Sequence, residues 1–425
     1  MQSPHYMRAT TTMISFSHKD SLDHIINQFM LDIFMLICII QICMIHYSEI
    51  LKERRLMNPF KYGTIVSGKD FCGRKTLLKQ IIKYIESSQH IVILGERRVG
   101  KSSVVYEAVL KCNGEQLLYV DLLGIKSIDA LCRRILRAIV VLEQKTGWFD
   151  KIIKTLSYLR PTISVDPITS MPTVSFDASV EMKANSISEV LTLIEFLGKK
   201  RRPIVVFDEF QDILNLKDSH EALALLRSKI QFQSDIPYIF VGSIRHKMDE
   251  IFTHHDSPFF KSAIPLTVDP LPYEEFSKFL KKKFTMGQRK IENEVLEKVF
   301  KIANNIPGDI QQLCESLWEV TSGKEIISPD KLKNALELIF AREQKSYESY
   351  ISLLTNIQLK CLMAVAKEGG KNVFSVSFMK SAGFNNPSSV QRAITRLTKL
   401  NILFESGNEY RFINPFFRAW LPYKG

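Results

Sequence analysis

The sequence lacks the features of a disulfide-stabilised, zinc-binding or repetitive protein. Its seven cysteines are odd in number and scattered, without a CxxC pair, which excludes a disulfide framework and indicates reduced thiols in a cytosolic compartment. The nine histidines are also scattered. We interpret His254-His255 as a lone pair, without a cysteine or a carboxylate at the spacing of metal ligands. We therefore expect no metal site built from histidines. Internal repeats and low-complexity tracts are absent too.

Long hydrophobic runs are also scarce. The apolar stretch at residues 33–45 is interrupted only by Gln41, but it is shorter than the roughly 20 residues of a membrane-spanning helix. No small-residue cleavage motif follows it, so a secretory signal is not expected. Three interpretations of residues 1–56 stay open: an anchor that contacts the membrane through residues 33–45, an amphipathic docking helix, or an upstream extension outside the functional protein. The third is favoured because Met57 begins a stretch typical of a domain start.

Composition sets broad limits on the class of protein. A chain of 425 residues predicts two or three domains, and 45% hydrophobic with 24% charged residues is ordinary for a globular protein. The formal charge of +12 and a pI near 9.2 suggest anionic partners, among which nucleotides and nucleic acids are both candidates. We expect a cytoplasmic location, with membrane association only if residues 33–45 act as an anchor.

The stretch HIVILGERRVGKSS at residues 90–103 is the strongest motif. A buried apolar strand at residues 91–94 runs into Gly95-x-x-x-x-Gly100-Lys101-Ser102, the pattern of a phosphate-binding loop that precedes a helix. Glycines let the backbone N–H groups wrap a polyphosphate, and the helix N-terminus is positive. Lys101 would reach the β- and γ-phosphates, and the Ser102 hydroxyl would ligate Mg²⁺. The predicted nucleotide-binding residues are Gly95, Glu96, Arg97, Arg98, Val99, Gly100, Lys101, Ser102, Ser103 and Asp208.

Two later strand ends carry the remaining predicted catalytic groups. Residues 203–211, PIVVFDEFQ, form an apolar strand that ends in Asp208-Glu209; Asp208 would hold Mg²⁺ and Glu209 would polarise the attacking water. A strand at residues 238–241 ends in Gly242-Ser243. Ligand-facing groups of open α/β sheets lie at such ends, so Ser243 is predicted to sense the γ-phosphate or the water.

Residues 58–74 contain several aromatic residues before a helix at residues 76–87. Phe60, Tyr62 and Phe71 would supply an apolar wall for an adenine ring, with Arg74 close by. The alternative is ordinary packing of this segment onto the core, and both interpretations stay open.

The rest of the pattern predicts three further regions. Strands at residues 116–121 and 263–268 complete the sheet, with helices at residues 128–142 and 187–197 and a hairpin of residues 162–165 and 173–176. Helical periodicity at residues 274–284, 292–303, 310–320 and 330–341 predicts an all-α lid. We therefore divide the chain into residues 1–56, an ATPase core at 57–272, the lid at 273–348 and a last domain at 349–425.

Residues 349–425 read as a winged helix-turn-helix. Helices are expected at residues 358–366, 376–382 and 388–400, the last capped by Ser388, followed by a hairpin of residues 402–405 and 409–412 around Ser406-Gly407-Asn408. Arg392, Arg396 and Lys399 recur at spacings of four and three, so they share one helix face and are candidates for nucleic-acid contact. The same basic face would also serve solubility or protein docking, so double-stranded DNA and a protein partner both stay open.

In this order, the phosphate loop, the VVFDEFQ strand, the Gly-Ser strand end, the helical lid and the winged helix resemble the archaeal-type ATPases of the AAA+/STAND group. The resemblance covers about residues 57–425. Its more specific marks are Asn58-Pro59-Phe60 with F-x-G-R at residues 71–74, and the closing INPFFRAWL at residues 413–421. It implies a P-loop NTPase fold with a five-stranded parallel sheet in the order 5-1-4-3-2, ATP as the nucleotide, and the roles given above for Lys101, Ser102, Asp208, Glu209 and Ser243.

Two departures from that group bear on the rate of turnover. Lys261 stands in SPFFKSA where members often carry an arginine before the fifth strand, and no arginine lies near residues 307–309 of the lid. Both favour a slow nucleotide switch over rapid hydrolysis. The leading hypothesis is thus an ATP-hydrolysing switch coupled to the winged helix. The alternatives are a DNA-binding regulator that turns ATP over slowly and a protein-interaction scaffold; self-association stays open.

Overall fold

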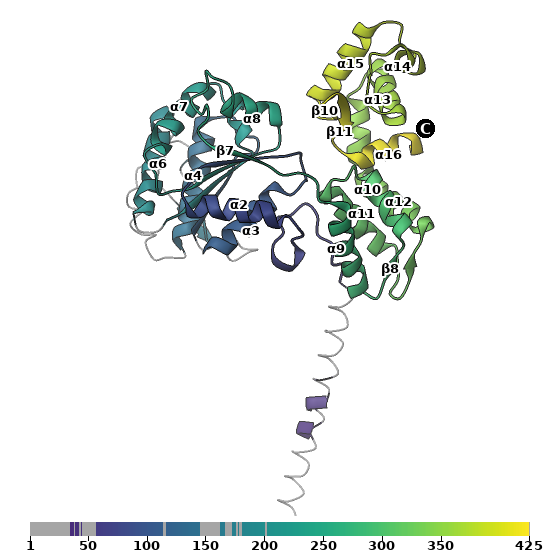
Figure 1. Cartoon of the computed structure of the whole chain (residues 1–425), viewed down its shortest axis with the longest axis horizontal. Helices are drawn as coiled ribbons and strands as arrows, with labels where there is room; N and C mark the ends of the chain where they lie inside the picture. The colour runs from purple at the N-terminus through teal and green to yellow at the C-terminus, as the bar shows by residue number, and fades with distance from the viewer. Residues whose placement is uncertain are drawn as a thin grey trace, which may run out of the picture. The chain divides into compact units, whose positions relative to one another are not determined.

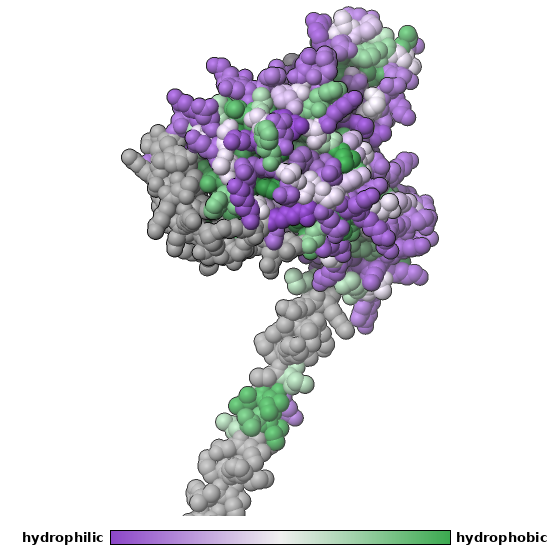
Figure 2. All heavy atoms as spheres, turned by 60° about the vertical axis from the view of Figure 1, so that its left-hand side comes forward, coloured by the Kyte–Doolittle hydropathy of each residue, from purple (hydrophilic) through white to green (hydrophobic). Residues whose placement is uncertain are grey.

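The computed structural model describes residues 35–37, 39–41, 44, 57–113, 116–144, 162–165, 172–175, 177, 181–199 and 202–424. The seven described residues before Met57 are exposed, and most are apolar (Figure 2). Within the described part, no helix combines the length and apolar character needed to cross a membrane. Residues 33, 34, 38, 42, 43 and 45 of the stretch lie outside the described residues, and its predicted role stays a prediction.

A five-stranded parallel sheet forms the centre of the ATPase core (Figure 1). Its strands are β1 (Ile91–Leu94), β2 (Leu117–Asp121), β5 (Ile204–Asp208), β6 (Tyr238–Gly242) and β7 (Ile264–Thr267). The spatial order is β2-β5-β6-β1-β7, and every neighbouring pair is parallel. Counted along the chain, this is the predicted order 5-1-4-3-2, which is confirmed. Every residue of β1, β5 and β6 is buried, because helices cover both faces of the sheet.

Alternate residues of each strand face opposite layers of helices. Ile91 and Ile93 of β1 pack in the apolar layer beneath α2 (Lys75–Glu86) and α3 (Lys101–Asn113), whereas Val92 and Leu94 pack in the opposite layer. The helices of that opposite layer are α4 (Ile128–Gln144), α6 (Ala184–Gly198), α7 (Ser219–Ile230) and α8 (Arg245–Phe252). The predicted hairpin is present as the antiparallel pair β3 (Thr162–Val165) and β4 (Pro172–Ser175).

The predicted helical lid contains the four expected helices. They are α9 (Tyr273–Met286), α10 (Asn293–Ile302), α11 (Pro307–Glu319) and α12 (Pro329–Ser352). A two-residue parallel pair that the pattern did not predict, β8 (Lys290–Ile291) with β9 (Ile326–Ile327), precedes α10 and α12. Because α12 runs on to Ser352, the predicted boundary between residues 348 and 349 lies inside one continuous helix.

The C-terminal region is a winged helix, as predicted. It contains α13 (Asn356–Glu368), α14 (Val376–Ser381), α15 (Pro387–Lys399), the wing strands β10 (Leu403–Ser406) and β11 (Glu409–Phe412), and α16 (Pro415–Lys424). The closing INPFFRAWL motif forms α16, whose Phe417 and Trp420 pack against Tyr347 of α12. Fully burying such a side chain stabilises a fold by about 1.5–3 kcal/mol, so this motif stabilises the end of the chain.

The predicted cap of α15 was wrong by two residues. Asn386 is the N-cap, and its side-chain oxygen accepts a hydrogen bond from the backbone N–H of Ser389 at 2.9 Å. Ser388 lies inside the first turn and donates its hydroxyl to the same oxygen at 2.9 Å. The reason is Pro387, which occupies the first helical position where its missing N–H costs nothing. The cap therefore has to precede the proline.

Candidate nucleotide site

The phosphate loop connects β1 to α3 and is held against the sheet by close contacts. A Cβ at Gly95 would lie 2.6 Å from the backbone oxygen of Val268, so no larger residue fits there without a shift of the backbone. Gly100 has φ of +96°, which L-residues rarely adopt. Between these glycines, Val99 is buried and fixes the loop to the core. The loop thus keeps its backbone close to the carboxyl end of the sheet.

Lys101 begins α3 with a side chain that is almost fully buried. Its Nζ donates a hydrogen bond to the backbone oxygen of Glu96 at 2.9 Å, across the loop. Burial lowers the pKa of Lys101 to about 8, although the nearby carboxylates of Glu209 and Asp208 favour its charged form. The cation is therefore already held inside the loop that is predicted to wrap the phosphates.

Ser102 and Asp208 lie in direct contact. The Ser102 hydroxyl donates to Asp208 Oδ2 at 2.6 Å, and the hydroxyl of Tyr119 on β2 donates to the same oxygen. Asp208 Oδ1 accepts the backbone N–H of Glu209 at 2.9 Å. Burial, followed by the charge of Asp208, raises the pKa of Tyr119, so this phenol stays a donor. A carboxylate and a hydroxyl oxygen side by side are a donor set that suits Mg²⁺.

Glu209 and Ser243 are also brought together by Gln211, the last residue of the PIVVFDEFQ motif, to which sequence reasoning gave no role. Glu209 Oε2 accepts hydrogen bonds from Ser243 Oγ at 2.6 Å and from Gln211 Nε2 at 2.5 Å. Gln211 is 1% exposed, and its Oε1 accepts the backbone N–H of Ser243 at 3.3 Å. Gln211 thereby joins the ends of β5 and β6 and holds the Glu209 carboxylate in one orientation.

Arg74 supports the phosphate loop through backbone oxygens and also lines the cavity beside it. Its guanidinium donates to the backbone oxygens of Gly100 (3.2 Å), Val99 and Asp269 (3.1 Å). Burial lowers the pKa of Arg74 to about 10, so the group remains charged at neutral pH. The described contacts of Arg74 are therefore with loop carbonyls, which agrees with a structural role.

The three aromatic residues of segment 58–74 divide between the two interpretations. Phe60 is buried against Phe284 and Trp318, with ring centroids at 4.5 and 6.2 Å, so it packs in the core of the lid. Tyr62 and Phe71 instead line a cavity of about 570 Å³ beside the phosphate loop. The cavity wall also includes Arg97–Ser103, Glu209, Leu271, Phe276, Phe279, Pro307, Gly308 and Gln311. Its volume is in the range of small-molecule sites.

The side chain of Arg98 leaves the loop and binds the first turn of α11. Its Nη1 lies 2.5 Å from Asp309 Oδ1, and its Nη2 donates to Gln312 Oε1 at 2.7 Å. The backbone N–H of Gly308 donates to the Arg98 oxygen at 3.0 Å, an approach so close that a Cβ at residue 308 would meet Arg98 atoms at 2.9 Å. Burial raises the pKa of Asp309 to about 6, against the effect of the Arg98 charge. Sequence reasoning missed this connection between the loop and the lid.

Glu96 also directs its side chain away from the loop. Its Oε1 accepts the hydroxyl of Ser406 at 3.1 Å and lies 3.9 Å from Arg411 Nη1; both residues belong to the wing strands. Arg411 is paired with Glu409 as well, at 3.0 Å. The neighbouring Arg97 is exposed at the cavity wall.

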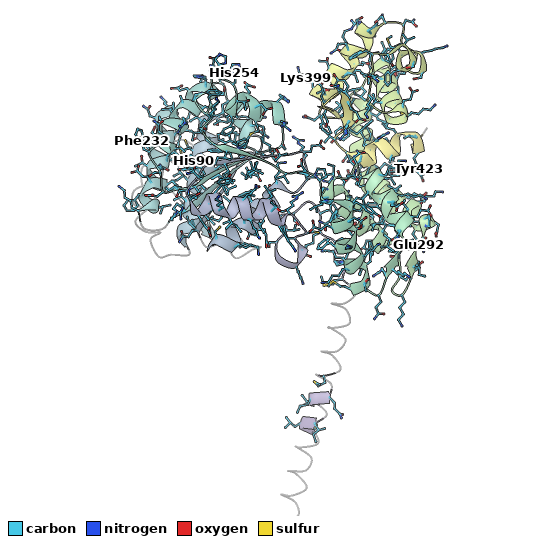
Figure 3. The ribbon with its side chains drawn as sticks, in the orientation of Figure 1. His90, Phe232, His254, Glu292, Lys399 and Tyr423 are labelled. Carbon is cyan, nitrogen blue, oxygen red and sulfur yellow. The ribbon has the colours of Figure 1, made fainter. Side chains whose placement is uncertain are left out.

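The candidate nucleic-acid residues occupy the exposed face of α15. Arg392, Arg396 and Lys399 are exposed, and Lys399 is labelled near the end of that helix in Figure 3. Val390, Ile394 and Leu397 on the opposite side are buried, as the spacing predicts.

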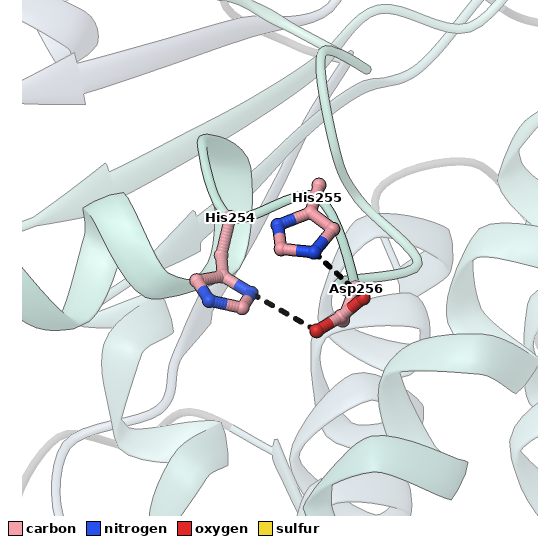
Figure 4. Close-up of side chains that lie close together, drawn as sticks. All are labelled: His254, His255 and Asp256. Atoms are coloured by element: carbon pink, nitrogen blue, oxygen red, sulfur yellow. Dashed lines mark ion pairs between the residues drawn. The ribbon is translucent and has the colours of Figure 1, made fainter.

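The histidine pair has a carboxylate neighbour that the sequence reading overlooked. Asp256 lies 3.8 Å from His254 Nδ1 and 3.2 Å from His255 Nε2 on a turn after α8 (Figure 4). All three side chains are exposed, and their possible ligand atoms lie within 4.8 Å of one another. Exposed groups of this kind are common without an ion, and no buried side chain of the described residues completes the set.

Comparisons with known proteins agree with the order of these elements. Residues 71–313 match a family described as an ATPase domain predominantly from Archaea, and residues 345–423 match a probable winged helix domain. None of the curated proteins matches the chain.

The chain is also similar to solved structures at low sequence identity. The Walker-type ATPase of Pyrococcus abyssi superposes with a TM-score of 0.57 and 17% identity, covering 87% of this chain and 99% of that one. The ORC1 protein of Aeropyrum pernix, solved in complex with DNA, has a TM-score of 0.49 and 12% identity, with 87% and 95% covered. The RuvB Holliday junction branch migration motor of Thermotoga maritima has a TM-score of 0.42 and 15% identity, with 81% and 94% covered. At this identity the first likeness concerns the fold alone.

Proposed function

Because the chain belongs to the family of ATPase domains found predominantly in Archaea, we propose that it is an ATP-driven molecular switch that hydrolyses ATP slowly with Mg²⁺. One observation carries the proposal. The side chains of Lys101, Ser102, Asp208, Glu209 and Ser243 converge beside the carboxyl ends of β1, β5 and β6. That edge of an open parallel sheet is where ligands bind.

Lys101 is the proposed phosphate-binding cation. Its Nζ already lies inside the loop and donates to the Glu96 backbone oxygen. A phosphate oxygen would replace that carbonyl as a stronger, charged acceptor. A bound polyanion also favours the charged form, which opposes the lowering of the Lys101 pKa by burial. Lys101 therefore binds the β- and γ-phosphates at neutral pH without leaving its position.

Ser102 and Asp208 would hold Mg²⁺, which when bound neutralises charge on the phosphates. Their oxygens are in contact at 2.6 Å, and the Tyr119 hydroxyl keeps Asp208 oriented. Glu209 would polarise the attacking water, while Ser243 and Gln211 hold its carboxylate from one side. In this proposal Lys101, Ser102 and Asp208 bind the phosphates and Mg²⁺, and Glu209 acts as the general base.

The proposed switch connects the phosphate loop to the lid and the winged helix. Arg98 binds α11, so a change in the loop on nucleotide binding or hydrolysis reaches the lid directly. Slow turnover is proposed because Lys261, whose amine lies over the Phe260 ring at 5.1 Å, stands where an arginine would act. In this view residues 57–272 act as the ATPase core, 273–348 as the lid and 349–425 as the winged helix domain.

A second candidate function is DNA binding by the winged helix. The exposed Arg392, Arg396 and Lys399 of α15 favour it, because cations on the face of a recognition helix contact phosphates. A protein-docking role of the same face is the alternative, and ATP turnover measured with and without duplex DNA separates the two.

The decisive test of the ATPase proposal compares the intact chain with Glu209→Gln. The variant keeps the size and the hydrogen bonds of the side chain but removes the general base, so we expect ATP binding to persist and hydrolysis to fall by about 100-fold or more. Gln344→Ala, an exposed change on α12, is the control that should leave both unchanged. Wild-type turnover in Glu209→Gln would remove Glu209 from this role.

A further inference from the structure

We propose that Gln311, on the lid helix α11, recognises the adenine base of the bound nucleotide. The inference rests on the proposed ATP binding and adds the residue that distinguishes adenine from guanine. It starts from a buried amide group that lacks a partner in the protein.

Gln311 is 8% exposed, and its Oε1 has no hydrogen-bond partner among the described residues. The adjacent Gln312 shows the contrast, because its amide bonds both Arg98 and Glu343. A buried amide oxygen without a donor destabilises the protein, so such groups in native folds are unusual and suggest an external partner. Gln311 is also one of the residues that line the cavity beside the phosphate loop.

The helix register aims Gln311 at the nucleotide. Pro307, Gly308 and Gln311 lie on one face of α11, and all three line the cavity. The first turn is fixed to the phosphate loop by the hydrogen bond from Gly308 to the backbone of Arg98. A side chain one turn later is therefore held at a constant distance from the loop that would bind the phosphates.

The cavity wall contains a set of apolar residues in addition to the charged residues of the phosphate loop. Leu271, Phe276 and Phe279 come from the lid side, and Ile65 and Val66 come from segment 58–74. These apolar side chains suit a planar base, whereas a phosphate needs cations or N–H donors, which the phosphate loop supplies at Lys101. The base is therefore expected between these residues, with the phosphates on the Lys101 side.

The chemistry of the unpaired atom selects the base. An amide oxygen accepts a hydrogen bond, and the 6-amino group of adenine donates one, whereas guanine has a carbonyl oxygen at that position. Phosphate oxygens only accept, so they do not satisfy this atom. If the amide were turned to present its nitrogen, it would instead bind phosphate, and the experiment is built to separate the two arrangements.

The test measures the affinities of the full chain for Mg·ATP and Mg·GTP by calorimetry. The wild type should prefer ATP by at least about tenfold. In Gln311→Ala the ATP affinity should fall about tenfold while the GTP affinity changes by less than about threefold, so the preference is lost. Gln311→Glu keeps the acceptor oxygen and should retain the preference for ATP over GTP. Gln344→Ala, a glutamine on the exposed surface of α12, should behave as the wild type.

Folding and binding effects are separated by melting each variant without nucleotide. Because Gln311→Ala removes an unpaired buried oxygen, its melting temperature should not fall, and nucleotide added afterwards should stabilise it less than the wild type. An equal loss of ATP and GTP affinity would assign Gln311 to the phosphates and overturn base recognition, as would unchanged affinities for both. A wild type that binds neither nucleotide would instead overturn the proposed function itself.

Discussion

The ion pair between Arg98 and Asp309 offers the most direct test of the connection between the phosphate loop and the lid. Arg98→Ala removes the cation that lies 2.5 Å from Asp309 and the donor to Gln312 at 2.7 Å. The Asp309 side chain is only 3% exposed, so the variant leaves a buried carboxyl group without its partner. We therefore expect the first turn of α11 to open more often, while the sheet stays folded.

The magnitude follows from the burial of the two partners. Removing one member of a fully buried pair costs about 3–5 kcal/mol, but Arg98 is one-third exposed and solvent screens its charge. Protonation of Asp309, whose pKa is already about 6, relieves a further part of the cost. We expect a local loss of about 2 kcal/mol, which is about a 30-fold fall in the protection of α11 amides from hydrogen exchange.

Hydrogen exchange of the full chain without nucleotide, followed peptide by peptide, measures this loss. Peptides of α11 should lose protection, while those of α13 in the winged helix should not. Arg97→Ala is the matched control, because Arg97 is the adjacent loop arginine and is exposed. The double variant Arg98→Ala/Asp309→Asn should recover part of the protection, since it removes the stranded acid. Unchanged protection in Arg98→Ala, or an equal loss in Arg97→Ala, would refute the assigned connection.

Four shorter predictions follow from the same geometry. Lys101→Ala should abolish ATP binding in a nucleotide titration, because the loop loses its buried cation. Gln211→Ala should lower the turnover number with little change in KM, since it frees the Glu209 carboxylate without touching the phosphate loop. Asp309 binds more protons in the folded than in the unfolded chain between about pH 4 and pH 6, so its contribution to stability is lost as pH rises through about 6. Asp309→Asn should remove about 2 kcal/mol of pH dependence, measured as the stability difference from the wild type at about pH 4 and about pH 7. Replacing Arg392 and Arg396 with alanine should flatten the log–log salt dependence of duplex-DNA affinity by about two units, and an unchanged slope would favour protein docking.

Much of the ATPase core could be predicted because its signals are local. The strand at residues 91–94 is a run of apolar residues that stops at a glycine, and the structure places β1 at those residues. The same holds for β5, which ends at Asp208 as the motif requires. Parallel strands are buried on both faces, so apolar runs mark them clearly, and the carboxyl end of each run gives the edge where the site lies.

The features that sequence reasoning missed depend on contacts between segments that are distant in the sequence. No pattern near Arg98 indicates its partner Asp309, and none near Tyr119 indicates that its hydroxyl reaches Asp208 on another strand. Helix α12 was predicted to stop near residue 341 because the apolar periodicity ends there. Its continuation to Ser352 begins with Arg342, Glu343, Gln344 and Lys345, which favour helix, and Tyr347 then packs against Phe417 and Trp420 of α16. The cap of α15 was predictable, since Pro387 already marks the first helical residue.

The contacts of the phosphate loop explain how a small change at the nucleotide would travel through this chain. Lys101 and Ser102 point toward the strand ends, Arg98 points to α11, and the Glu96 side chain bonds Ser406 of the wing. These residues belong to one short segment, so a shift of its backbone moves all of these contacts together. Lys101 also donates a hydrogen bond to the Glu96 backbone oxygen. If Lys101 bound phosphates instead, the Glu96 backbone would lose this hydrogen bond. We infer that phosphate binding acts on the lid and the wing through the loop itself, without a separate relay.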